Sequence, residues 1–318
     1  MKILVTGATG FVGGAVVRRL LADGHAVRAA VRQARSIDGV EVVVVDEIDG
    51  RTDWEIALRD IDVVVHLAAR VHVMQDTAAG SALFRATNTE GTLRLARSMR
   101  EAGARRIVSL STIKVNGEET RAGLRFSADD QPGPTDPYAI SKHDAEVGLF
   151  AMPGLETVVI RPPLVYGPGV KGNLARLCRL AQLGMPVPFG AIRNRRDLVG
   201  VGNLADLIAR CLDHPSAAGQ VFLASDGVSL STRKLYSMIA EAMARPARML
   251  NVPPAVLRRV GGMLGQLAEL ERLTGSLEID IEKTRRMLAW SPPETVETGI
   301  RQMAQAFIEQ RTSERAMQ

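Results

Sequence analysis

The sequence predicts an α/β protein with a doubly wound parallel sheet, followed by a smaller, mostly helical C-terminal lobe. Short β-branched runs alternate with longer segments of helical periodicity as far as Arg161. Repeated strand–helix–strand units of this kind form parallel sheets with helices on both faces. After Arg161, prolines and glycines interrupt the alternation, and the later segments are mostly helical.

Six segments are expected to form the sheet, because apolar residues at successive positions are typical of strands covered on both faces. They are Lys2–Val5, Ala26–Val31, Glu41–Val45, Val63–Leu67, Arg106–Leu110 and Thr157–Arg161. Helices are expected between them at Val12–Ala22, Asp53–Arg59, Ala82–Ala102 and Tyr138–Phe150.

Residues 1–161 are expected to form the main domain and residues 162–318 mainly the smaller lobe, with later segments such as 197–213 returning to the main domain. The lobe would cover the carboxyl ends of the strands, where ligands of such sheets bind. Its expected helices are Leu174–Leu183, Leu204–Asp213, Thr232–Ala244 and Val256–Leu273.

Composition excludes several classes of protein. The 318 residues are 46% hydrophobic and 24% charged, as in ordinary globular domains. The most apolar stretch, Pro253–Leu270, is interrupted by Arg258 and Arg259, so no membrane insertion is expected. The start lacks the apolar stretch and cleavage site of a signal peptide, and a cytoplasmic location is expected.

The cysteines, the histidines and the net charge bear on disulfides, metal sites and the kind of binding partner. Cys178 and Cys211 are the only cysteines, which makes a disulfide framework unexpected. The five histidines are scattered without metal-ligand spacing, so no metal site is predicted. The net charge of +5 is spread along the chain, which suits an anionic small substrate better than nucleic acid.

A glycine-rich turn follows the first expected strand, with the sequence Thr6-Gly7-Ala8-Thr9-Gly10-Phe11-Val12-Gly13. Gly7 would permit a tight turn, Gly10 would let the backbone approach phosphates, and Gly13 would let helix and strand pack closely. The helix start then offers partial positive charge to the anion. This pattern predicts a dinucleotide cradle in a Rossmann-type sheet; a βα turn without a ligand is the alternative.

The end of the second strand bears on the choice between NAD and NADP. An acidic residue there usually binds the ribose hydroxyls of NAD, but this strand ends in Val31-Arg32. A guanidinium at Arg32 could pair with the 2′-phosphate of NADP, and this tips the prediction toward NADP. Asp46, after the third strand, is a candidate for the adenine amino group, or a simple turn residue.

Tyr138 and Lys142 lie one helical turn apart in Tyr138-Ala139-Ile140-Ser141-Lys142. A free tyrosine has a pKa of about 10 and is a poor base at neutral pH. The Lys142 ammonium and a positively charged nicotinamide are together expected to favour the phenolate by their charge. Tyr138 could then exchange a proton while a nicotinamide exchanges a hydride.

Together these motifs resemble the extended short-chain dehydrogenase/reductase family, specifically its NAD-dependent epimerase/dehydratase branch of nucleotide-sugar 4-epimerases and 4-keto-reductases. The resemblance spans nearly the whole chain. It includes the glycine turn, the Tyr138/Lys142 pair, His66-Leu67-Ala68-Ala69, Asn88-Thr89-Glu90-Gly91-Thr92, Ser111-Thr112, Arg161-Pro162-Pro163-Leu164-Val165-Tyr166-Gly167-Pro168 and Arg196-Asp197-Leu198-Val199.

The resemblance implies roles for further residues. Thr112 would join Tyr138 and Lys142 as a catalytic residue by holding the substrate oxygen, with Ser111 as its neighbour and fallback. Cofactor contacts implied beyond the glycine turn, Arg32 and Asp46 are Leu67, Ala68, Ala69, Asn88, Tyr138, Lys142 and Pro162. Substrate contacts implied are Ser111, Thr112, Lys114, Asn173, Phe189 and Arg196, the last facing the nucleotide diphosphate.

The resemblance also implies a UDP-linked hexose as substrate, reacting at C4, and a homodimer. Two reactions remain open: reduction of a 4-keto sugar with NADPH, toward which the missing ribose carboxylate tips the prediction, and 4-epimerisation with retained NAD. Dehydration is disfavoured because Ile113-Lys114 stand where the family's dehydratases carry an Asp-Glu pair. A non-catalytic NAD(P) sensor on the same fold is the alternative from another class.

Overall fold

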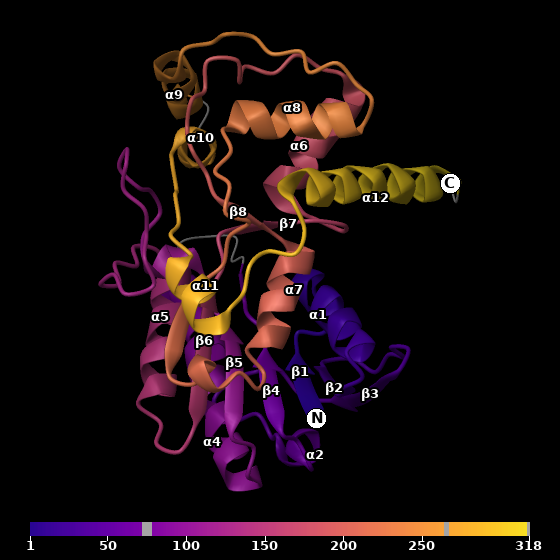
Figure 1. Cartoon of the computed structure of the whole chain (residues 1–318), viewed down its shortest axis with the longest axis vertical. Coiled ribbons are helices and arrows are strands. Elements are labelled where there is room, and N and C mark those ends of the chain that lie inside the picture. The colour runs from indigo at the N-terminus through magenta and orange to yellow at the C-terminus, as the bar shows by residue number, and fades with distance from the viewer. Residues whose placement is uncertain (72–77, 264–266, 317–318) are drawn as a thin grey trace.

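The computed structural model describes residues 1–71, 78–263 and 267–316. Its centre is a seven-stranded sheet in which all neighbouring strands run parallel, in the order β3-β2-β1-β4-β5-β6-β9 (Figure 1). The bounds are β1 Lys2–Thr6, β2 Ala26–Val31, β3 Val40–Val44, β4 Val63–His66, β5 Arg106–Leu110, β6 Glu156–Arg161 and β9 Gln220–Leu223. The predicted doubly wound, Rossmann-type sheet is confirmed.

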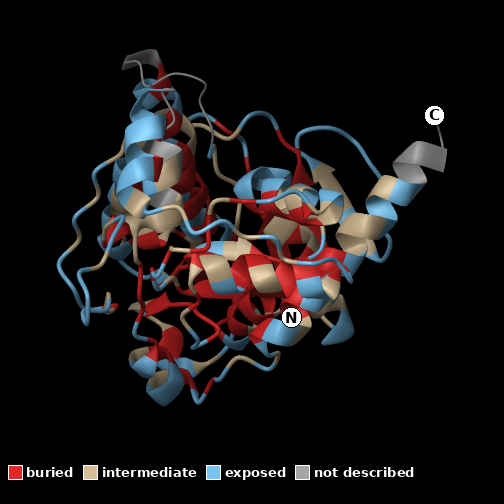
Figure 2. Cartoon of the chain, turned by 90° about the horizontal axis from the view of Figure 1, so that it is seen from above, coloured by how far each residue is buried: buried red, intermediate tan, exposed pale blue. Residues whose placement is uncertain are grey.

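The inner strands are buried on both faces, as their continuous apolar sequence predicts. In β1, Ile3 and Val5 belong to the core on one face of the sheet, whereas Leu4 belongs to the core on the other face. Figure 2 shows buried residues gathered in the interior and exposed ones on the outer surfaces of the helices. The sheet therefore has two apolar faces, each of which needs a layer of helices.

The third strand differs from its prediction. It spans Val40–Val44 rather than Glu41–Val45, and it forms one edge of the sheet. Val44 is more than half exposed, so this strand is not covered on both faces. A β-branched run alone does not distinguish an edge strand from a central one.

Helices cover both faces of the sheet. One face packs against α1 (Phe11–Ala22) and α7 (Val201–Arg210), which also contact each other. The other face packs against α2 (Glu55–Leu58), α4 (Thr92–Ala102) and α5 (Pro137–Phe150). The strand order reverses between β1 and β4, and ligands of such sheets bind in the crevice at that point.

The later helices form a second apolar core beyond the carboxyl ends of the strands, at the upper end in Figure 1. The helices of this region are α6 Gly172–Leu183, α8 Thr232–Ala242, α9 Pro254–Met263, α10 Leu267–Thr274 and α12 Val296–Ala316. A two-stranded parallel sheet, β7 (Leu164–Tyr166) and β8 (Leu198–Gly200), lies between this lobe and the main sheet. The chain also returns to the main sheet through β9 and α11 (Glu282–Leu288).

The expected helix Ala82–Ala102 begins earlier and is not uniform. It consists of α3 (Ala78–Phe84), a π-helical segment Arg85–Gly91, and α4. A π-helical turn holds an extra residue, and such turns are frequent at functional sites. Asn88 lies within this segment and is buried.

Other elements also differ from expectation, among them β7, β8 and α11, which were not predicted. Strand β9 and helix α12 were not predicted, and the expected helix Val256–Leu273 is replaced by α9 and α10. Residues 264–266, between these two helices, lie outside the described part of the chain. Within the ranges described, no helix combines the length and apolar character needed to cross a membrane.

Candidate functional site

The glycine turn lies directly after β1, at the point where the strand order reverses. Gly7 has φ +71°, in the region that favours glycine. A Cβ built on Gly7 would lie 2.8 Å from the Ala68 nitrogen, and one on Gly13 would lie 2.0 Å from the Gly7 carbonyl oxygen. Both positions therefore require glycine, because backbone from β1, β4 and α1 approaches them closely.

The start of α1 fits the phosphates of a dinucleotide. Gly10 is the N-cap and supplies no side-chain hydrogen bond to the helix start. The first backbone N–H groups of a helix have no partner within the helix and attract anions. Thr9 is exposed in the turn, while Phe11 and Val12 are half-buried against the core. The residues present thus fit NAD or NADP at this turn.

The other predicted cofactor contacts lie along the same edge of the sheet. Leu67, Ala68 and Ala69 follow β4 and are half-buried beside the glycine turn. Arg32 and Asp46 follow the neighbouring strands β2 and β3; both are exposed.

Helix α5, which carries Tyr138 and Lys142, begins with a capped turn that includes Tyr138. Asp136 is the N-cap, and its Oδ1 accepts a hydrogen bond from the Ala139 N–H at 2.6 Å. Pro137 occupies the first helical position, which its fixed φ favours. The Tyr138 ring packs edge-on against Phe84 of α3, with ring centroids 5.9 Å apart.

Lys142 lies one turn after Tyr138 on α5, and its side chain is almost fully buried. Burial lowers the pKa of its ammonium to about 8, and the nearby Glu146 carboxylate offsets part of this effect. Burial and the Asp136 carboxylate raise the pKa of Tyr138 to about 12. Burial and Asp136 therefore oppose acidification of the phenol in the chain alone. A further positive charge beside the phenol is needed to lower its pKa.

Replacing Lys142 by methionine is expected to change the pH dependence of stability. The pKa is about 8 when folded and 10.5 for a free lysine, so between these values the unfolded chain binds more protons. The wild-type free energy of unfolding should thus rise by up to about 3 kcal/mol from pH 8 to 10.5, an increase that Lys142→Met lacks. Urea unfolding at pH 7.5 and pH 10 measures this rise in the free energy of unfolding. An equal rise in the wild type and in Lys142→Met would contradict a buried ammonium at Lys142. Tyr138 contributes a fall only above pH 10.

Two polar contacts hold the end of β5 against α5. Ser111, directly after β5, donates a short hydrogen bond to Glu146, which also forms a buried ion pair with Arg161 at 2.5 Å. Lys114 forms a close ion pair with Asp136 at the other end of this interface. Thr112 lies between Ser111 and Lys114, as Tyr138 lies between Asp136 and Glu146. The two contacts therefore hold the Thr112 segment beside the Tyr138 turn.

This arrangement argues against two of the predicted substrate contacts, Ser111 and Lys114, because other side chains already bind their polar groups. The Ser111 hydroxyl proton is given to Glu146 in the buried network, and so is not directed to a substrate. The Lys114 ammonium is neutralised by Asp136 and by Glu118, at 2.9 Å from the latter. Thr112 is half-buried, and its Oγ1 accepts a bond from the Lys114 N–H at 3.3 Å, which leaves its own proton available.

Asn88 and Pro162 hold neighbouring segments together. Asn88 is fully buried and bonds the backbone N–H and carbonyl of Arg70 at 2.8 and 3.0 Å. Its Nδ2 also donates to Ser141 Oγ of α5 at 3.0 Å. The Pro162 carbonyl accepts a bond from the Ile113 N–H at 2.9 Å. Asn88 thus ties the segment that follows β4 to helix α5.

The predicted substrate contacts of the lobe lie in different surroundings. Asn173 is exposed at the start of α6, beside Gly172. Phe189 is buried in the lobe core, edge-on to Tyr236 with centroids 5.8 Å apart, so it packs rather than offering an open face. Arg196 is half-buried, and its Nη1 donates to the Gly275 carbonyl at 3.1 Å.

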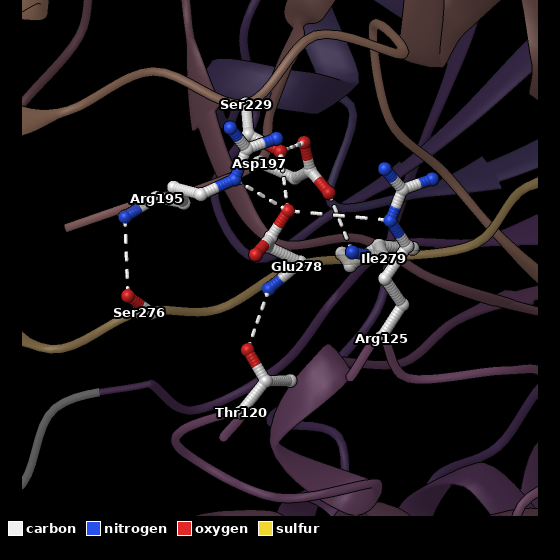
Figure 3. A network of polar contacts seen from close by, with 8 residues as sticks. All are labelled: Thr120, Arg125, Arg195, Asp197, Ser229, Ser276, Glu278 and Ile279. Carbon is white, nitrogen blue, oxygen red and sulfur yellow. Dashed lines mark hydrogen bonds and ion pairs between the residues drawn. The ribbon is translucent and has the colours of Figure 1, made fainter. Parts of the chain in front are cut away.

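The neighbouring Arg195 belongs to a polar network around Glu278 (Figure 3). Its Nε donates to Glu278 Oε2 at 2.8 Å, and Arg125 lies 4.0 Å from the same oxygen. Asp197 accepts bonds from Ser229 Oγ at 2.9 Å and from the Ile279 N–H at 2.5 Å. The charge of Arg195 is therefore largely neutralised by Glu278.

Sequence reasoning missed Glu146 as a member of the site. Its spacing from Lys142, one further helical turn, was the available signal. His66 was quoted as part of a motif but was given no role. It is fully buried between Thr6 and Thr92, 2.8 and 2.9 Å from their hydroxyl oxygens.

Comparison with known proteins agrees with this geometry. Residues 3–224 match the model of the NAD dependent epimerase/dehydratase family. The chain belongs to this family. A UDP-glucose 4-epimerase of Vibrio cholerae is 45% identical over 97% of this chain and 96% of its own length. Another from Mycolicibacterium smegmatis is 33% identical over 96% of this chain and 98% of its own length.

Solved structures of the family have the same fold. The UDP-glucose 4-epimerase of Thermus thermophilus in complex with NAD superposes with a TM-score of 0.78 and 26% identity, over 97% of this chain and 99% of that one. The predicted membership of the extended short-chain dehydrogenase/reductase family is therefore confirmed, and the chain is an enzyme of that family.

Proposed function

We propose that the chain interconverts the C4 epimers of a UDP-linked hexose, with NAD held at the glycine turn. The observation that carries this proposal is the placement of Thr112, Tyr138 and the buried Lys142 at the β5–α5 interface. The similarity to the Vibrio cholerae enzyme, 45% identical along almost the whole chain, favours epimerisation over the reduction toward which the sequence tipped.

The chain's own residues supply proton transfer and orientation. Tyr138 takes the proton of the C4 hydroxyl as the C4–H bond breaks and returns it after the 4-keto sugar has turned over. Thr112 donates its free hydroxyl proton to the C4 oxygen, and Lys142 favours the phenolate by its charge. Bound NAD supplies the acceptor and later the donor of the hydride, and its oxidised ring adds the positive charge that Tyr138 requires.

Arg196 and Asn173 are the proposed contacts for the UDP part of the substrate. The Arg196 guanidinium can fork onto phosphate oxygens, and its half-buried position limits competition from water. Asn173 stands at the exposed start of α6, where its amide can reach a sugar or a phosphate.

The reduction of a 4-keto sugar with NADPH is the second candidate, favoured by one observation. Arg32 is exposed at the end of β2 and forms no hydrogen bond with another described residue. A carboxylate is usual at this place in NAD-binding sheets. A 2′-phosphate would pair with this guanidinium.

The decisive experiment incubates the purified protein with UDP-galactose without added reductant. We expect UDP-glucose to appear, and denaturation of the protein should release bound NAD. Consumption of NADPH with a UDP-4-keto-6-deoxyhexose, without any epimerisation, would favour the reductase. If UDP-hexoses, UDP-N-acetylhexosamines and the keto sugar all remain unchanged, the proposed function is wrong.

A homodimer formed through α5 and the helical segment 78–102 is part of the proposal. Ile140, Val147 and Phe150 on α5 and Leu83 on α3 are exposed apolar side chains, and helices with such faces associate to cover them. Sedimentation should give twice the chain mass of 34.3 kDa; a monomer would contradict this assembly.

A further inference from the structure

A chain of hydrogen bonds, most of them buried, leads from the glycine turn across the sheet. The Ala68 N–H donates to Thr6 Oγ1 at 3.2 Å, and that oxygen lies 2.8 Å from His66 Nδ1. On the other side of the imidazole, Nε2 lies 2.9 Å from Thr92 Oγ1, which is 2.6 Å from the Asn88 carbonyl oxygen. His66 therefore joins the end of β1 to the start of α4.

Counting donors fixes the protonation of the imidazole. The Thr92 hydroxyl has one proton, which it gives to the Asn88 carbonyl, so its oxygen must accept from His66. The proton of neutral His66 is thus on Nε2, and bare Nδ1 accepts from the Thr6 hydroxyl. An added proton on Nδ1 would leave the Thr6 hydroxyl proton without this acceptor.

The surroundings of His66 also oppose a positive charge. The side chain is fully buried, and the charge of Lys142 on α5 is close enough to act on it. Burial first, and Lys142 second, lower the pKa of His66 to about 3. The neutral form therefore persists throughout the physiological range.

The path continues from Asn88 to helix α5. Asn88 Nδ2 donates to Ser141 Oγ at 3.0 Å, and that hydroxyl donates to the Tyr138 carbonyl at 2.7 Å. Thr89 Oγ1 donates to the Ser141 carbonyl at 2.8 Å. The π-helical segment thus bonds α5 at the residue before Lys142 and within the turn that carries Tyr138.

We infer that His66, as the neutral Nε2–H tautomer, is a positioning residue that sets the glycine turn at a fixed distance from the Tyr138–Lys142 turn. The dinucleotide would bind at one end of this path and the proton-transferring phenol at the other. A misplacement of about 1 Å between reacting groups can cost on the order of 100-fold in rate. The inference rests on the proposed function for its kinetic part only.

Two pairs of variants separate the two halves of the path. Thr92→Val removes the hydroxyl at nearly constant volume, while Thr92→Ser keeps it. His66→Gln keeps a donor near the Nε2 position and loses the acceptor for Thr6, whereas His66→Asn keeps that acceptor and loses the donor to Thr92. Purified full-length variants are compared by kcat, KM, dinucleotide dissociation constant and thermal stability.

We expect Thr92→Val to lower kcat by about 10- to 100-fold with an unchanged dinucleotide dissociation constant, and Thr92→Ser to restore kcat. His66→Asn should resemble Thr92→Val. His66→Gln should instead weaken dinucleotide binding, because it loosens Thr6 and Ala68 beside the glycine turn. Equal kcat in Thr92→Val and Thr92→Ser, or a loss of stability alone in all four variants, would overturn the inference.

The tautomer is tested on the wild-type protein without any turnover. Long-range ¹H–¹⁵N correlation of labelled histidine, with His66 assigned by its loss in His66→Gln, should show the neutral Nε2–H form from pH 5 to pH 8. A proton on Nδ1, or an imidazolium at pH 6, would overturn the inference. Because this readout and dinucleotide binding need no sugar, a protein inactive on UDP-sugars would refute the proposed function and leave this test standing.

Discussion

Replacing Tyr138 by phenylalanine is expected to lower kcat by about 10³-fold, within the range that general acid–base groups contribute. The variant loses only the hydroxyl, which forms no hydrogen bond with another described residue. The ring keeps its edge-on contact with Phe84, so folding and dinucleotide binding should be unchanged. Steady-state epimerisation, thermal unfolding and NAD titration measure the three quantities.

Tyr236→Phe is the matched control. Tyr236 likewise packs edge-on against a phenylalanine, and its hydroxyl donates to the Met185 carbonyl at 3.3 Å, far from α5 in the sequence. Loss of this bond should cost about 1 kcal/mol of stability and leave kcat unchanged. If Tyr138→Phe retained full activity, Tyr138 would not transfer the proton; a wild-type protein that binds NAD without any sugar turnover would favour the non-catalytic sensor.

The fold could be predicted largely because its signals are local. Buried parallel strands are continuous apolar runs, and most of the expected strands agree with β1–β6 to within a residue or two. Strand β9 was not predicted, because Gln220–Leu223 is short and lies among helical segments. The π-helical segment Arg85–Gly91 was not predicted either, because one extra residue in a turn barely alters the hydrophobic period of a helix.

In the candidate site, too, the features formed by neighbouring residues could be predicted, whereas contacts between distant residues could not. The glycine turn and the Tyr138–Lys142 pair are local patterns, and the sequence revealed both. The contact of Ser111 with Glu146 joins residues 35 apart, and that of Asn88 with Ser141 joins residues 53 apart. Only the folded chain brings these groups together, so this network around α5 could not be predicted from the sequence.

Gly13→Ala is expected to destroy the dinucleotide cradle even though it adds a single methyl group. The added Cβ would lie 2.0 Å from the Gly7 carbonyl oxygen and 2.8 Å from Ala8 Cα. These are backbone atoms that cannot rotate away, so α1 must move off β1. We expect a loss of about 3 kcal/mol in stability and a fall of about 100-fold in dinucleotide affinity.

Gly14→Ala tests whether steric overlap, rather than the loss of a glycine from α1, causes the effects expected for Gly13→Ala. Gly14 is the next residue of α1, and a Cβ there meets only the end of the Arg18 side chain at 3.6 Å. This variant should gain up to about 1 kcal/mol, because alanine has the higher helix propensity, and should bind NAD as the wild type does. Urea unfolding and NAD titration compare the pair. Wild-type stability and affinity in Gly13→Ala would mean that α1 does not approach β1 as closely as the structure shows, and the phosphate cradle at its N-terminus would lose its geometric basis.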